Sequence, residues 1–447
     1  MASKLKDSEV PWIGKMPIHW TLHRMKSCVI DRTSGAWGNE AVGDDGDTIC
    51  LRIADFDFSK FRFKNIPLEE LTIRNYDSET IKRLTLKKGD ILIEKSGGGE
   101  KTPVGRTVIF DKDYRALYAN FMDRLRCSDL VKSLWMQYVF VTFYKNGYSK
   151  NYIKQTTGIQ NLDLTTMLAS ERIPVPSISE QNKIVSFLDT ECARIDTVIE
   201  QTRTSIEEYK KLKQAVITQA ITKGIRPNRP MKDSGIEWIG EICEDWNLTK
   251  IKVGITKVGS GKTPSGGADA YSEKGILFLR SQNIYDTGLV LDNPTYITAN
   301  IDEEMRNTRV QPEDVLLNIT GGSIGRCCIF PANLVSANVN QHVSIIRVIK
   351  SVFLPKFMHY YWLSKLGYMA IHLYQTGGNR EGMTADAIKN SPILLPNIDE
   401  QQEIVDFLDS KCKEMDSLIA KKEQFLSELE NYKKSLIFEY VTGKKEI

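Results

Sequence analysis

The sequence lacks every feature expected of a membrane or secreted protein. None of its 447 residues fall in a run of about 18 apolar positions, the length a helix needs to span a bilayer. The start of the chain, MASKLKDSEV, is charged where a secretory signal would be apolar. We therefore expect a cytoplasmic protein with no membrane anchor.

Metal sites and disulfide frameworks have no sequence signature either. The eight cysteines contain no Cys-x-x-Cys pair, and the five histidines show no spacing typical of metal ligands. Cysteines of this kind are usually reduced, buried and structural. The sequence predicts neither a bound metal nor a disulfide scaffold.

Motifs for catalysis are equally scarce. The string Gly259-Ser-Gly-Lys-Thr263 resembles the end of a phosphate-binding loop, but the pattern needs glycine where Thr256 stands, and Pro264 obstructs the following helix. A Gly/Ser turn is the simpler interpretation. The nuclease-like Glu94-Lys95 pair becomes Asn318-Ile319 in a second copy of the same segment. We expect no catalytic residue and no cofactor bound by this chain.

Composition and charge indicate a globular protein with a basic surface outside two of its segments. Hydrophobic residues make up 41% and charged residues 26% of a chain long enough for two or more domains. The net charge of +3 is unevenly distributed: residues 178–224 balance to zero and residues 398–444 to −4, which leaves +7 on the remainder. An excess of positive charge there permits binding of a polyanion.

An internal repeat determines the organisation. The segment from Pro176 to Asp189 matches that from Pro396 to Asp409, and the offset of 220 residues holds without a gap through Thr222 and Thr442. Upstream the offset drifts from 228 to 218 through weaker matches, ending with Ala119-Asn120 against Ala337-Asn338. One unit has been duplicated, with a fixed spacer and diverged globular parts.

The well-matched segments are predicted to be long amphipathic helices. Positions alternately three and four apart, from Val185 to Ala220 and again 220 residues later, are apolar at nine of eleven places in each copy. The exceptions are Thr202, Lys213, Lys422 and Lys433. Ser179 and Asp399 stand where N-caps are expected. Each apolar seam must be buried, most simply against its duplicate, and the sequence leaves parallel and antiparallel pairing open.

The globular parts are predicted to be mixed α/β (α+β) domains. We expect strands in the apolar runs of residues 90–94, 107–110, 314–318 and 343–348, and helices over residues 134–150 and 354–374. The predicted organisation is a first domain at 1–177, a helix at 178–224, a linker at 225–234, a second domain at 235–397 and a helix at 398–444.

Repeated polar loops are the candidates for contact with DNA. Glycine-bearing turns that carry a basic or amide side chain can approach a phosphate or a base edge, although turns of this composition also serve strand geometry alone. The candidates are Arg52, Ser96, Lys101, Arg106, Asn120, Arg124, Gln160 and Asn161, and in the second half Arg280, Thr320, Ser323, Arg326, Asn338, Asn340, Gln341, Asn379 and Arg380.

The order of these motifs resembles the specificity subunits of type I restriction-modification systems. The resemblance rests on Trp-Ile-Gly at Trp12 and Trp238, on Gly89-Asp90-Ile-Leu-Ile, on the Pro-x-x-x-Glu-Gln-x-x-Ile-Val-x-Phe-Leu-Asp starts at Pro176 and Pro396, and on the Thr222 and Thr442 helix ends. It covers essentially the whole chain. One departure is Glu313, which replaces the glycine of the Gly-Asp pair.

The resemblance implies a function and a set of partners. It implies two target-recognition domains that each read half of a split site in double-stranded DNA, held by an antiparallel coiled coil. It implies two modification subunits that carry S-adenosylmethionine and a restriction and translocation subunit that uses ATP and Mg²⁺. It places at the partner and spacer interface Glu180, Gln181, Phe187, Leu188 and Asp189, with Glu400, Gln401, Phe407, Leu408 and Asp409. The alternative is a coiled-coil scaffold that assembles proteins without reading DNA.

Overall fold

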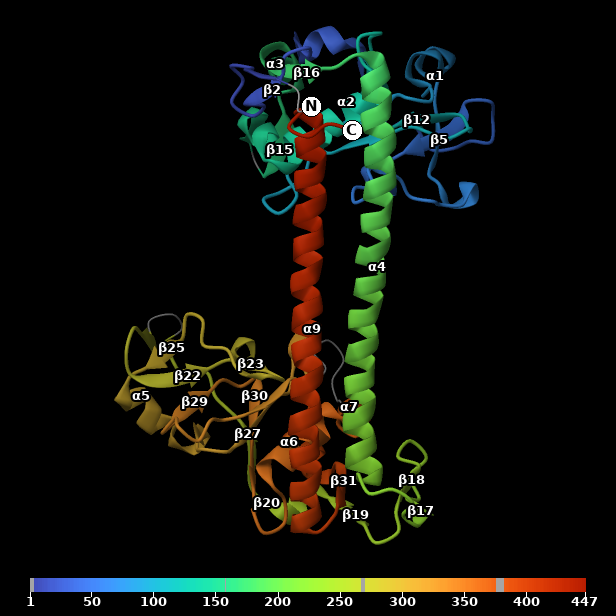
Figure 1. Ribbon diagram of the computed structural model, residues 1–447. Helices are drawn as coiled ribbons and strands as arrows, with labels where there is room; N and C mark the ends of the chain where they lie inside the picture. Colours follow the sequence, from blue (N-terminus) through green and yellow to red (C-terminus); the bar gives the residue numbers. More distant parts are fainter. Residues whose placement is uncertain (1–3, 157, 267–269, 375–381) are drawn as a thin grey trace. The chain divides into compact units, whose positions relative to one another are not determined.

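Two compact units make up the chain in the computed structural model. The structure describes residues 4–156, 158–266, 270–374 and 382–447. The first unit combines residues 1–204 with residues 423–447, and the second comprises residues 205–422. Each unit contains one globular domain and parts of both long helices (Figure 1). The two units are described separately below.

In the first unit, a four-stranded antiparallel sheet lies beside a three-stranded one. The larger has the order β11 (Thr107–Ile109), β9 (Ile91–Glu94), β13 (Met122–Cys127) and β4 (Val29–Ser34). The smaller has the order β12 (Ala116–Tyr118), β5 (Asp47–Leu51) and β8 (Ile73–Asn75), with β12 parallel to β5. Shorter strands are β1 (Leu5–Asp7), β2 (Lys15–Pro17), β3 (Thr21–Arg24), β6 (Phe56–Asp57), β7 (Arg62–Phe63), β10 (Ser96–Gly97), β14 (Ile153–Thr156), β15 (Ile159–Leu162) and β16 (Arg172–Val175).

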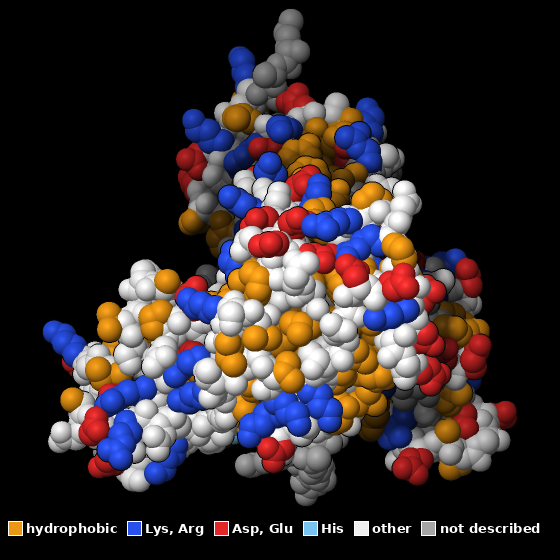
Figure 2. Space-filling view, turned by 90° about the horizontal axis from the view of Figure 1, so that it is seen from below, with side chains coloured by type: hydrophobic (Ala, Val, Ile, Leu, Met, Phe, Trp, Pro, Cys, Tyr) orange, Lys and Arg blue, Asp and Glu red, His pale blue; other side chains and the backbone are white. Residues whose placement is uncertain are grey.

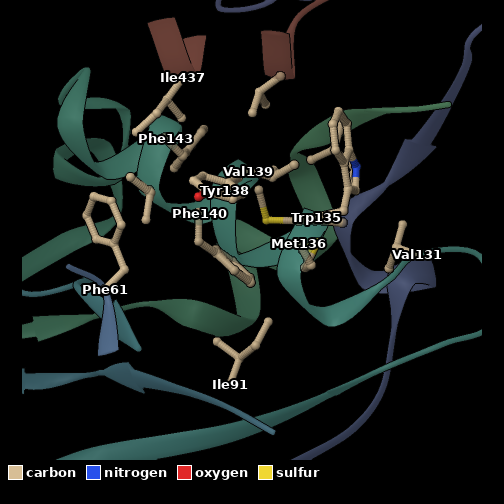
Figure 3. Packing of buried hydrophobic residues seen from close by; sticks show 14 of the residues in the cluster. Phe61, Ile91, Val131, Trp135, Met136, Tyr138, Val139, Phe140, Phe143 and Ile437 are labelled. Atoms are coloured by element: carbon tan, nitrogen blue, oxygen red, sulfur yellow. The ribbon is translucent and has the colours of Figure 1, made fainter. Parts of the chain in front are cut away.

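The core of the first unit forms around helix α2 (Ser133–Lys145). Trp135 and Met136 of this helix are fully buried, and they belong to one apolar cluster with Ile91 from the sheet and Ile437 from the last helix (Figure 3). The other helices of this domain are α1 (Ser78–Leu84) and α3 (Leu164–Ser170). The helix predicted over residues 134–150 is confirmed in position, but its predicted end is too late. The chain turns at Gly147, which has φ 81°, soon after α2 ends.

The second unit repeats this plan with different loops. Its four-stranded sheet has the order β20 (Ile255–Ser260), β30 (Val343–Val348), β27 (Val315–Asn318) and β28 (Cys327–Ile329). Its five-stranded sheet has the order β21 (Tyr271–Ser272), β25 (Thr295–Ile297), β22 (Ile276–Leu279), β29 (Ala337–Val339) and β26 (Arg309–Val310). The remaining strands are β17 (Met231–Asp233), β18 (Glu241–Cys243), β19 (Asn247–Lys250), β23 (Ile284–Tyr285), β24 (Gly288–Leu289) and β31 (Pro392–Leu395). All four predicted strand runs are confirmed.

The helix predicted over residues 354–374 is two helices. α6 (Pro355–Leu363) ends at Ser364, and α7 (Lys365–Tyr374) begins directly after it. The Ser364 hydroxyl accepts a hydrogen bond from the backbone N–H of Leu366 at 3.1 Å, so it caps the second helix. Gly367 permits the tight turn, since an added Cβ would lie 2.6 Å from the backbone of Trp362. The short helices of this unit are α5 (Ala299–Glu304) and α8 (Ala385–Asn390).

The long helices are α4 (Ile178–Lys223) and α9 (Ile398–Val441). Their N-caps lie two residues earlier than predicted. The Ser177 hydroxyl accepts from the N–H of Glu180 at 3.3 Å, and Asn397 Oδ1 accepts from that of Glu400 at 2.9 Å. The prolines before these caps cannot donate a hydrogen bond, which favours a helix start immediately after them.

The two long helices pair antiparallel in each unit. In the first unit the rings of Phe187 and Tyr440 lie 4.6 Å apart, and Asp196 binds Lys433 at 2.6 Å. In the second unit Lys213 binds Asp416 at 2.7 Å. Within the first unit the partner's number falls as the residue number rises, which defines antiparallel pairing (Figure 1).

The two ion pairs are the same contact seen twice. Asp196 and Asp416 are equivalent in the 220-residue repeat, as are Lys213 and Lys433. The repeat therefore builds the same contact between the two helices within each unit. It also explains why lysine interrupts the apolar seam in both helices. No helix within the described ranges combines the length and apolarity that a bilayer crossing would require.

Candidate nucleic-acid interface

Three loops far apart in sequence meet at one end of the sheets in the first unit. The N–H groups of Lys95 and Ser96 donate to the carbonyl of Phe121, at 2.9 and 3.3 Å. β10 pairs with β15, and the Ser96 hydroxyl donates to Asn161 Oδ1 at 2.7 Å. Asn120 and Asn161 are exposed beside them. The structure thus brings together four of the predicted DNA contacts, since Gln160 precedes Asn161 on β15.

The second unit builds the same cluster. The N–H of Ile319 donates to the carbonyl of His342 at 3.0 Å, and Thr320 shares a 2.6 Å hydrogen bond with His342 Nδ1. Gln341, which is exposed, bonds to His342 and accepts from the hydroxyl of Thr263. Thr320 also pairs with Gly382 as Ser96 pairs with Asn161, so three equivalent loops meet at the strand ends in both units.

These contacts correct the repeat alignment in the globular domains. The N–H of Ala119 donates to Leu51 and that of Met122 to Ala119, whereas Asn340 donates to Leu279 and Val343 to Asn340. Asn120 is therefore equivalent to Gln341, and the predicted match of Asn120 with Asn338 is wrong by three residues. The short Ala-Asn identity had no hydrophobic periodicity to support it, so it could be matched at the wrong register.

Asn338 consequently lies in the interior. It occupies the middle of β29, is fully buried, donates to Asp302 Oδ1 at 2.7 Å and accepts from the hydroxyl of Thr308. Asn340 is also buried, and its Oδ1 accepts from the N–H of His342 at 3.2 Å. Asn340 therefore supports the loop cluster from within, whereas Asn338 joins β29 to α5 and to the turn at Thr308.

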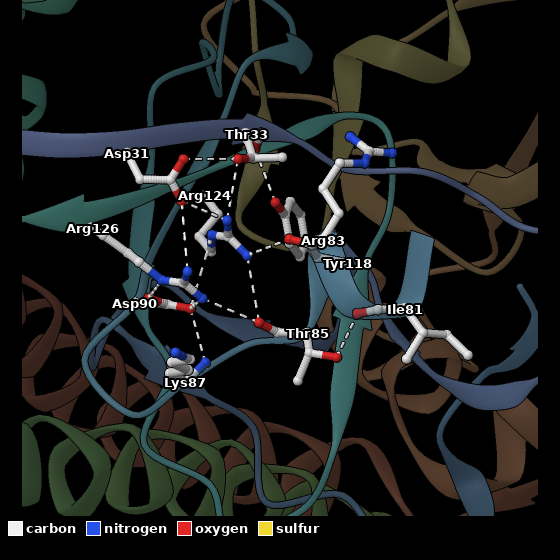
Figure 4. A network of polar contacts seen from close by, with 10 residues as sticks. All are labelled: Asp31, Thr33, Ile81, Arg83, Thr85, Lys87, Asp90, Tyr118, Arg124 and Arg126. Atoms are coloured by element: carbon white, nitrogen blue, oxygen red, sulfur yellow. Dashed lines mark hydrogen bonds and ion pairs between the residues drawn. The ribbon is translucent and has the colours of Figure 1, made fainter. Parts of the chain in front are cut away.

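Arg124 is likewise part of a buried network (Figure 4). Its guanidinium donates to Asp31 at 2.6 Å and to the carbonyl of Arg83 at 3.0 Å, and only 2% of the residue is exposed. Although partial burial opposes it, hydrogen bonds from Arg124 and Thr33 lower the pKa of Asp31. Because its guanidinium is buried and already bonded, Arg124 could contact DNA only by breaking these hydrogen bonds.

The other predicted DNA contacts differ in whether their side chains are already bonded within their own unit. Lys101 is exposed. Arg106 forms a bidentate pair with the buried Glu94 at 2.7 and 2.9 Å, whereas its copy Arg326 faces Asn318 instead and lies over the ring of Tyr285, 4.6 Å from its centre. The remaining sites are engaged locally: Arg52 with Asp55 at 3.2 Å, Arg280 with Thr295 at 2.9 Å, Ser323 with Asn318 at 3.2 Å and Gln160 with the Val104 N–H at 3.3 Å. Asn379 and Arg380 lie outside the described residues.

The residues at the helix starts link each long helix to its own domain. The indole N–H of Trp20 donates to Glu180 at 2.9 Å and that of Trp246 to Glu400 at 3.0 Å. Gln181 and Gln401 are fully buried and bond to backbone groups of the domain, while Asp189 and Asp409 accept from Tyr138 and Tyr360. Leu188 and Leu408 are fully buried, and Phe187 and Phe407 are half-buried. These residues therefore fix the angle between domain and helix.

The glycine-rich string near residue 260 is a strand end. Ser260 ends β20, and the N–H groups of Gly261 and Lys262 donate to Val343 and Val339. A Cβ on Gly261 would lie 1.8 Å from the carbonyl oxygen of Val339, so glycine is required by close backbone approach. No helix follows across residues 261–264, which agrees with a turn and not with a phosphate-binding loop.

Two features of the loop cluster escaped sequence reasoning. Phe121, next to Asn120, keeps 48% of its surface exposed, which is unusual for a large aromatic side chain in a connecting turn. His342 takes its place in the second unit. Neither residue stands in a recognisable motif, and only the hydrogen bonds between loops reveal their equivalence.

Known proteins that are similar to this chain identify its family. A model of the type I restriction modification DNA specificity domain matches residues 63–208 and 243–428, which together exceed half of the sequence. The chain belongs to this family of specificity domains. The family resemblance inferred from the motifs is thereby confirmed, including two recognition domains and a role in DNA specificity without catalysis.

Individual relatives agree over most of their length. A type I restriction enzyme specificity subunit of Methanocaldococcus jannaschii, MjaX, is 24% identical over 437 residues, covering 97% of this chain and 95% of the relative. The EcoKI specificity subunit of Escherichia coli K12 is 22% identical over 371 residues, covering 79% of this chain and 74% of the relative.

Solved structures share the fold. One chain from a study of complex assembly and conformational transition of the type I R-M system aligns with a TM-score of 0.71 at 14% identity, covering 96% of this chain and 99% of the other. The HsdS subunit of Thermoanaerobacter tengcongensis aligns with a TM-score of 0.50 at 13% identity, covering 96% and 98%.

Proposed function

We propose that each unit reads one half of a split DNA target through its own loop cluster. The observation that supports this most directly is the convergence of three equivalent loops in both units. Lys95 bonds to Phe121 as Ile319 bonds to His342, and Ser96 pairs with Asn161 as Thr320 pairs with Gly382. Loops on a rigid sheet can vary in side chain without loss of the fold. Duplicated clusters with different side chains suit the reading of two different half-sites.

The proposed contacts divide into two kinds. Asn120 and Asn161 in the first unit and Gln341 in the second carry exposed amides that can bond base edges, and Phe121 can stack on a base or a sugar. Lys101 is exposed and suited to a phosphate. Arg124 and Asn338 are left out of this proposal because both are buried and hydrogen-bonded within their units.

The proposal also covers the partners. We place this chain in a cytoplasmic complex with two modification subunits and a restriction and translocation subunit. S-adenosylmethionine, ATP and Mg²⁺ belong to those partners. The residues at the helix starts, from Glu180 to Asp189 and from Glu400 to Asp409, serve the partner interface mainly by holding the helices in position, since several are buried within their own unit.

Matched substitutions in the assembled complex test the assignment of half-sites. Asn120→Ala and Gln341→Ala remove equivalent exposed amides, and mapping of methylated bases across a genome reads the recognised sequence directly. Each variant is expected to relax one half of the motif by about 1–3 kcal/mol and to leave the other half unchanged. Lys4→Ala, at an exposed position outside the cluster, is the control.

Two outcomes would overturn the proposal. The first is that one substitution changes both halves of the motif. The second is that neither substitution changes the motif, which would mean that these loops do not read bases. For Lys101→Ala we expect a weaker affinity for all sequences and a salt dependence reduced by about one phosphate contact. A complex that assembles normally but binds no DNA would favour the scaffold alternative.

A further inference from the structure

The second unit contains a groove of about 1330 Å³, whereas the equivalent surface of the first unit, beside Phe61, holds a cavity of about 250 Å³. It runs between the last third of α4, the start of α7 and the loop before β28. Lys213, Ile217, Leu363 and Tyr368 are among its lining residues, with Arg326 from the loop. All of these belong to one unit, so the groove does not depend on the arrangement of the two units.

A difference in hairpin length explains why this surface is open in the second unit and mostly filled in the first. In the first unit β6 and β7 are joined by the four residues Phe58 to Phe61, whereas in the second unit β23 and β24 are joined by Asp286 and Thr287 alone. The strands themselves are equivalent, because Lys64 donates to Asp55 as Val290 donates to Asn283. The second hairpin is therefore two residues shorter at its tip.

The longer hairpin closes the first unit with an aromatic side chain. Phe61 is 8% exposed, and the ammonium of Lys433 lies 5.1 Å from its ring centre. Lys433 also donates to the carbonyl of Ser59 at 2.8 Å, and Gln137 Nε2 donates to the carbonyl of Phe61 at 3.4 Å. A ring, an ammonium and two hydrogen-bonded carbonyls thus fix the tip between α2 and α9.

The receiving residues are retained in the second unit. Lys213 is the copy of Lys433, and Leu363 is the copy of Val141, which lines a small cavity with Phe61. Gln137 corresponds to His359, as the neighbouring Tyr138 and Tyr360 show by their bonds to Asp189 and Asp409.

His359 is not among the residues that line the groove, but it lacks the bond that its copy makes to the hairpin. Its Nδ1 is buried and has no hydrogen-bond partner within the described part of the chain, whereas the copy in the first unit bonds to the hairpin. Burial lowers the pKa of His359 to about 4, so the ring is neutral at physiological pH. An unpaired buried nitrogen costs free energy until a partner supplies a hydrogen bond.

The edge of the groove is cationic. Among the residues that the structure describes, Lys211, Lys223 and Lys365 line it without an ion-pair partner. Lys210 is paired with Glu207, Lys213 is paired with Asp416, and Arg326 acts electrostatically on Asp286. Asp286, at the hairpin tip, is partly buried, which raises its pKa, and it accepts from the N–H of Cys327 at 3.1 Å. Figure 2 shows Lys and Arg side chains gathered in small groups among hydrophobic ones on the viewed face.

We propose that this groove binds a loop of a protein partner, with one aromatic side chain at its tip and acidic residues beside it. The aromatic ring takes the place that Phe61 fills in the first unit, over Lys213 and Leu363. The acidic residues match the free cations at the edge. Because the first unit is closed by its own hairpin, one such loop binds per chain, and the two-fold symmetry of the repeat is broken at this site.

A peptide based on the chain's own hairpin is the probe. Residues 55–64, closed by a disulfide between added terminal cysteines and labelled with fluorescein, are titrated with the full chain and followed by anisotropy. The acidic form carries Lys60→Glu, Arg62→Glu and Lys64→Glu. We expect it to bind with a stoichiometry of one and more tightly than the unchanged form, and Phe61→Ala in the peptide to weaken binding roughly tenfold or more.

Variants of the chain locate the site. The double variant Lys211→Glu with Lys365→Glu is expected to weaken binding of the acidic peptide and to strengthen binding of the unchanged, basic peptide. Lys232→Glu, at an exposed position outside the groove, is the control. Replacing Asp286-Thr287 by the tetrapeptide Phe58–Phe61 should close the groove, abolish binding and raise the Tm. The charge variant alters only side chains at the edge, so it tests the proposal even if the graft does not fold.

Several results would overturn this inference. They are absence of saturable binding, binding that is insensitive to Phe61→Ala or to the charge reversal, and a stoichiometry of two. Displacement of the peptide by a short duplex DNA would assign the groove to nucleic acid. None of these outcomes bears on the loop clusters, since the groove contains neither Asn120 nor Gln341.

Discussion

The repeated ion pair offers a sharp test because the same residues lie in two different environments. Lys433 and Asp196 keep 9% and 16% of their side chains exposed, whereas Lys213 and Asp416 keep 24% and 46%. Lys433 donates to both oxygens of Asp196 and to the carbonyl of Ser59. We consider the equivalent substitutions Asp196→Ala and Asp416→Ala.

The two substitutions are expected to lower the free energy of unfolding by amounts that differ severalfold. Asp196→Ala leaves the ammonium of Lys433 nearly buried with one neutral acceptor, and removing one partner of a buried pair costs about 3–5 kcal/mol. We expect the lower end of that range, since some solvent reaches both groups. Asp416→Ala removes the partner of Lys213, a lysine that water already reaches. We therefore expect the free energy of unfolding to fall by less than about 1 kcal/mol.

Urea unfolding combined with hydrogen exchange resolves the two units. Exchange in residues 178–204 reports the first unit, and exchange in residues 205–223 reports the second. The control is Asp196→Ala together with Lys433→Met, which removes both charges and should recover a large part of the loss. Equal losses for the two single substitutions, or no recovery in the control, would refute the argument from burial.

Three further outcomes follow from local geometry. Gly261→Ala should destabilise the second unit by more than about 2 kcal/mol in urea, because its Cβ would meet the carbonyl of Val339 at 1.8 Å, while Gly259→Ala, with open space around it, should change little. The bonds from Lys154 and Thr166 lower the pKa of Asp163 to about 2, so its contribution to stability is complete above about pH 4 and lost as the pH falls toward 2; Asp163→Asn should flatten this part of the acid unfolding curve. Burial raises the pKa of each of the eight cysteine thiols, so a thiol reagent at pH 8 should react slowly until urea unfolds the chain. A fast-reacting native thiol would contradict the last expectation.

The structure brings together only some of the residues predicted to contact DNA, for a physical reason. Ser96, Asn120 and Asn161 belong to one cluster as their repeated loop motifs suggested. Arg124 and Asn338 do not, because a polar residue on a strand can point to either face, and one step of register exchanges surface for interior. Asn338 was matched to Asn120 with an error of three residues, an odd number that likewise exchanges the two faces of a strand. Sequence identity over two residues could not decide between them.

The sequence by itself determined the duplication, the two long helices and two strands in each four-stranded sheet. These depend on periodicities of about 3.5 and 2 residues, which local chemistry imposes and a single chain displays. It also predicted that lysine would interrupt the seam, without indicating what the lysine binds.

Only the tertiary structure decided the antiparallel pairing, the meeting of three loops and the open groove. Each depends on residues distant in sequence, such as Asp196 with Lys433, or on the length of a hairpin far from the surface it covers. A difference of two residues between Phe58–Phe61 and Asp286-Thr287 is inconspicuous in the sequence. In three dimensions it decides whether an aromatic side chain closes the surface between helix and sheet or leaves it open.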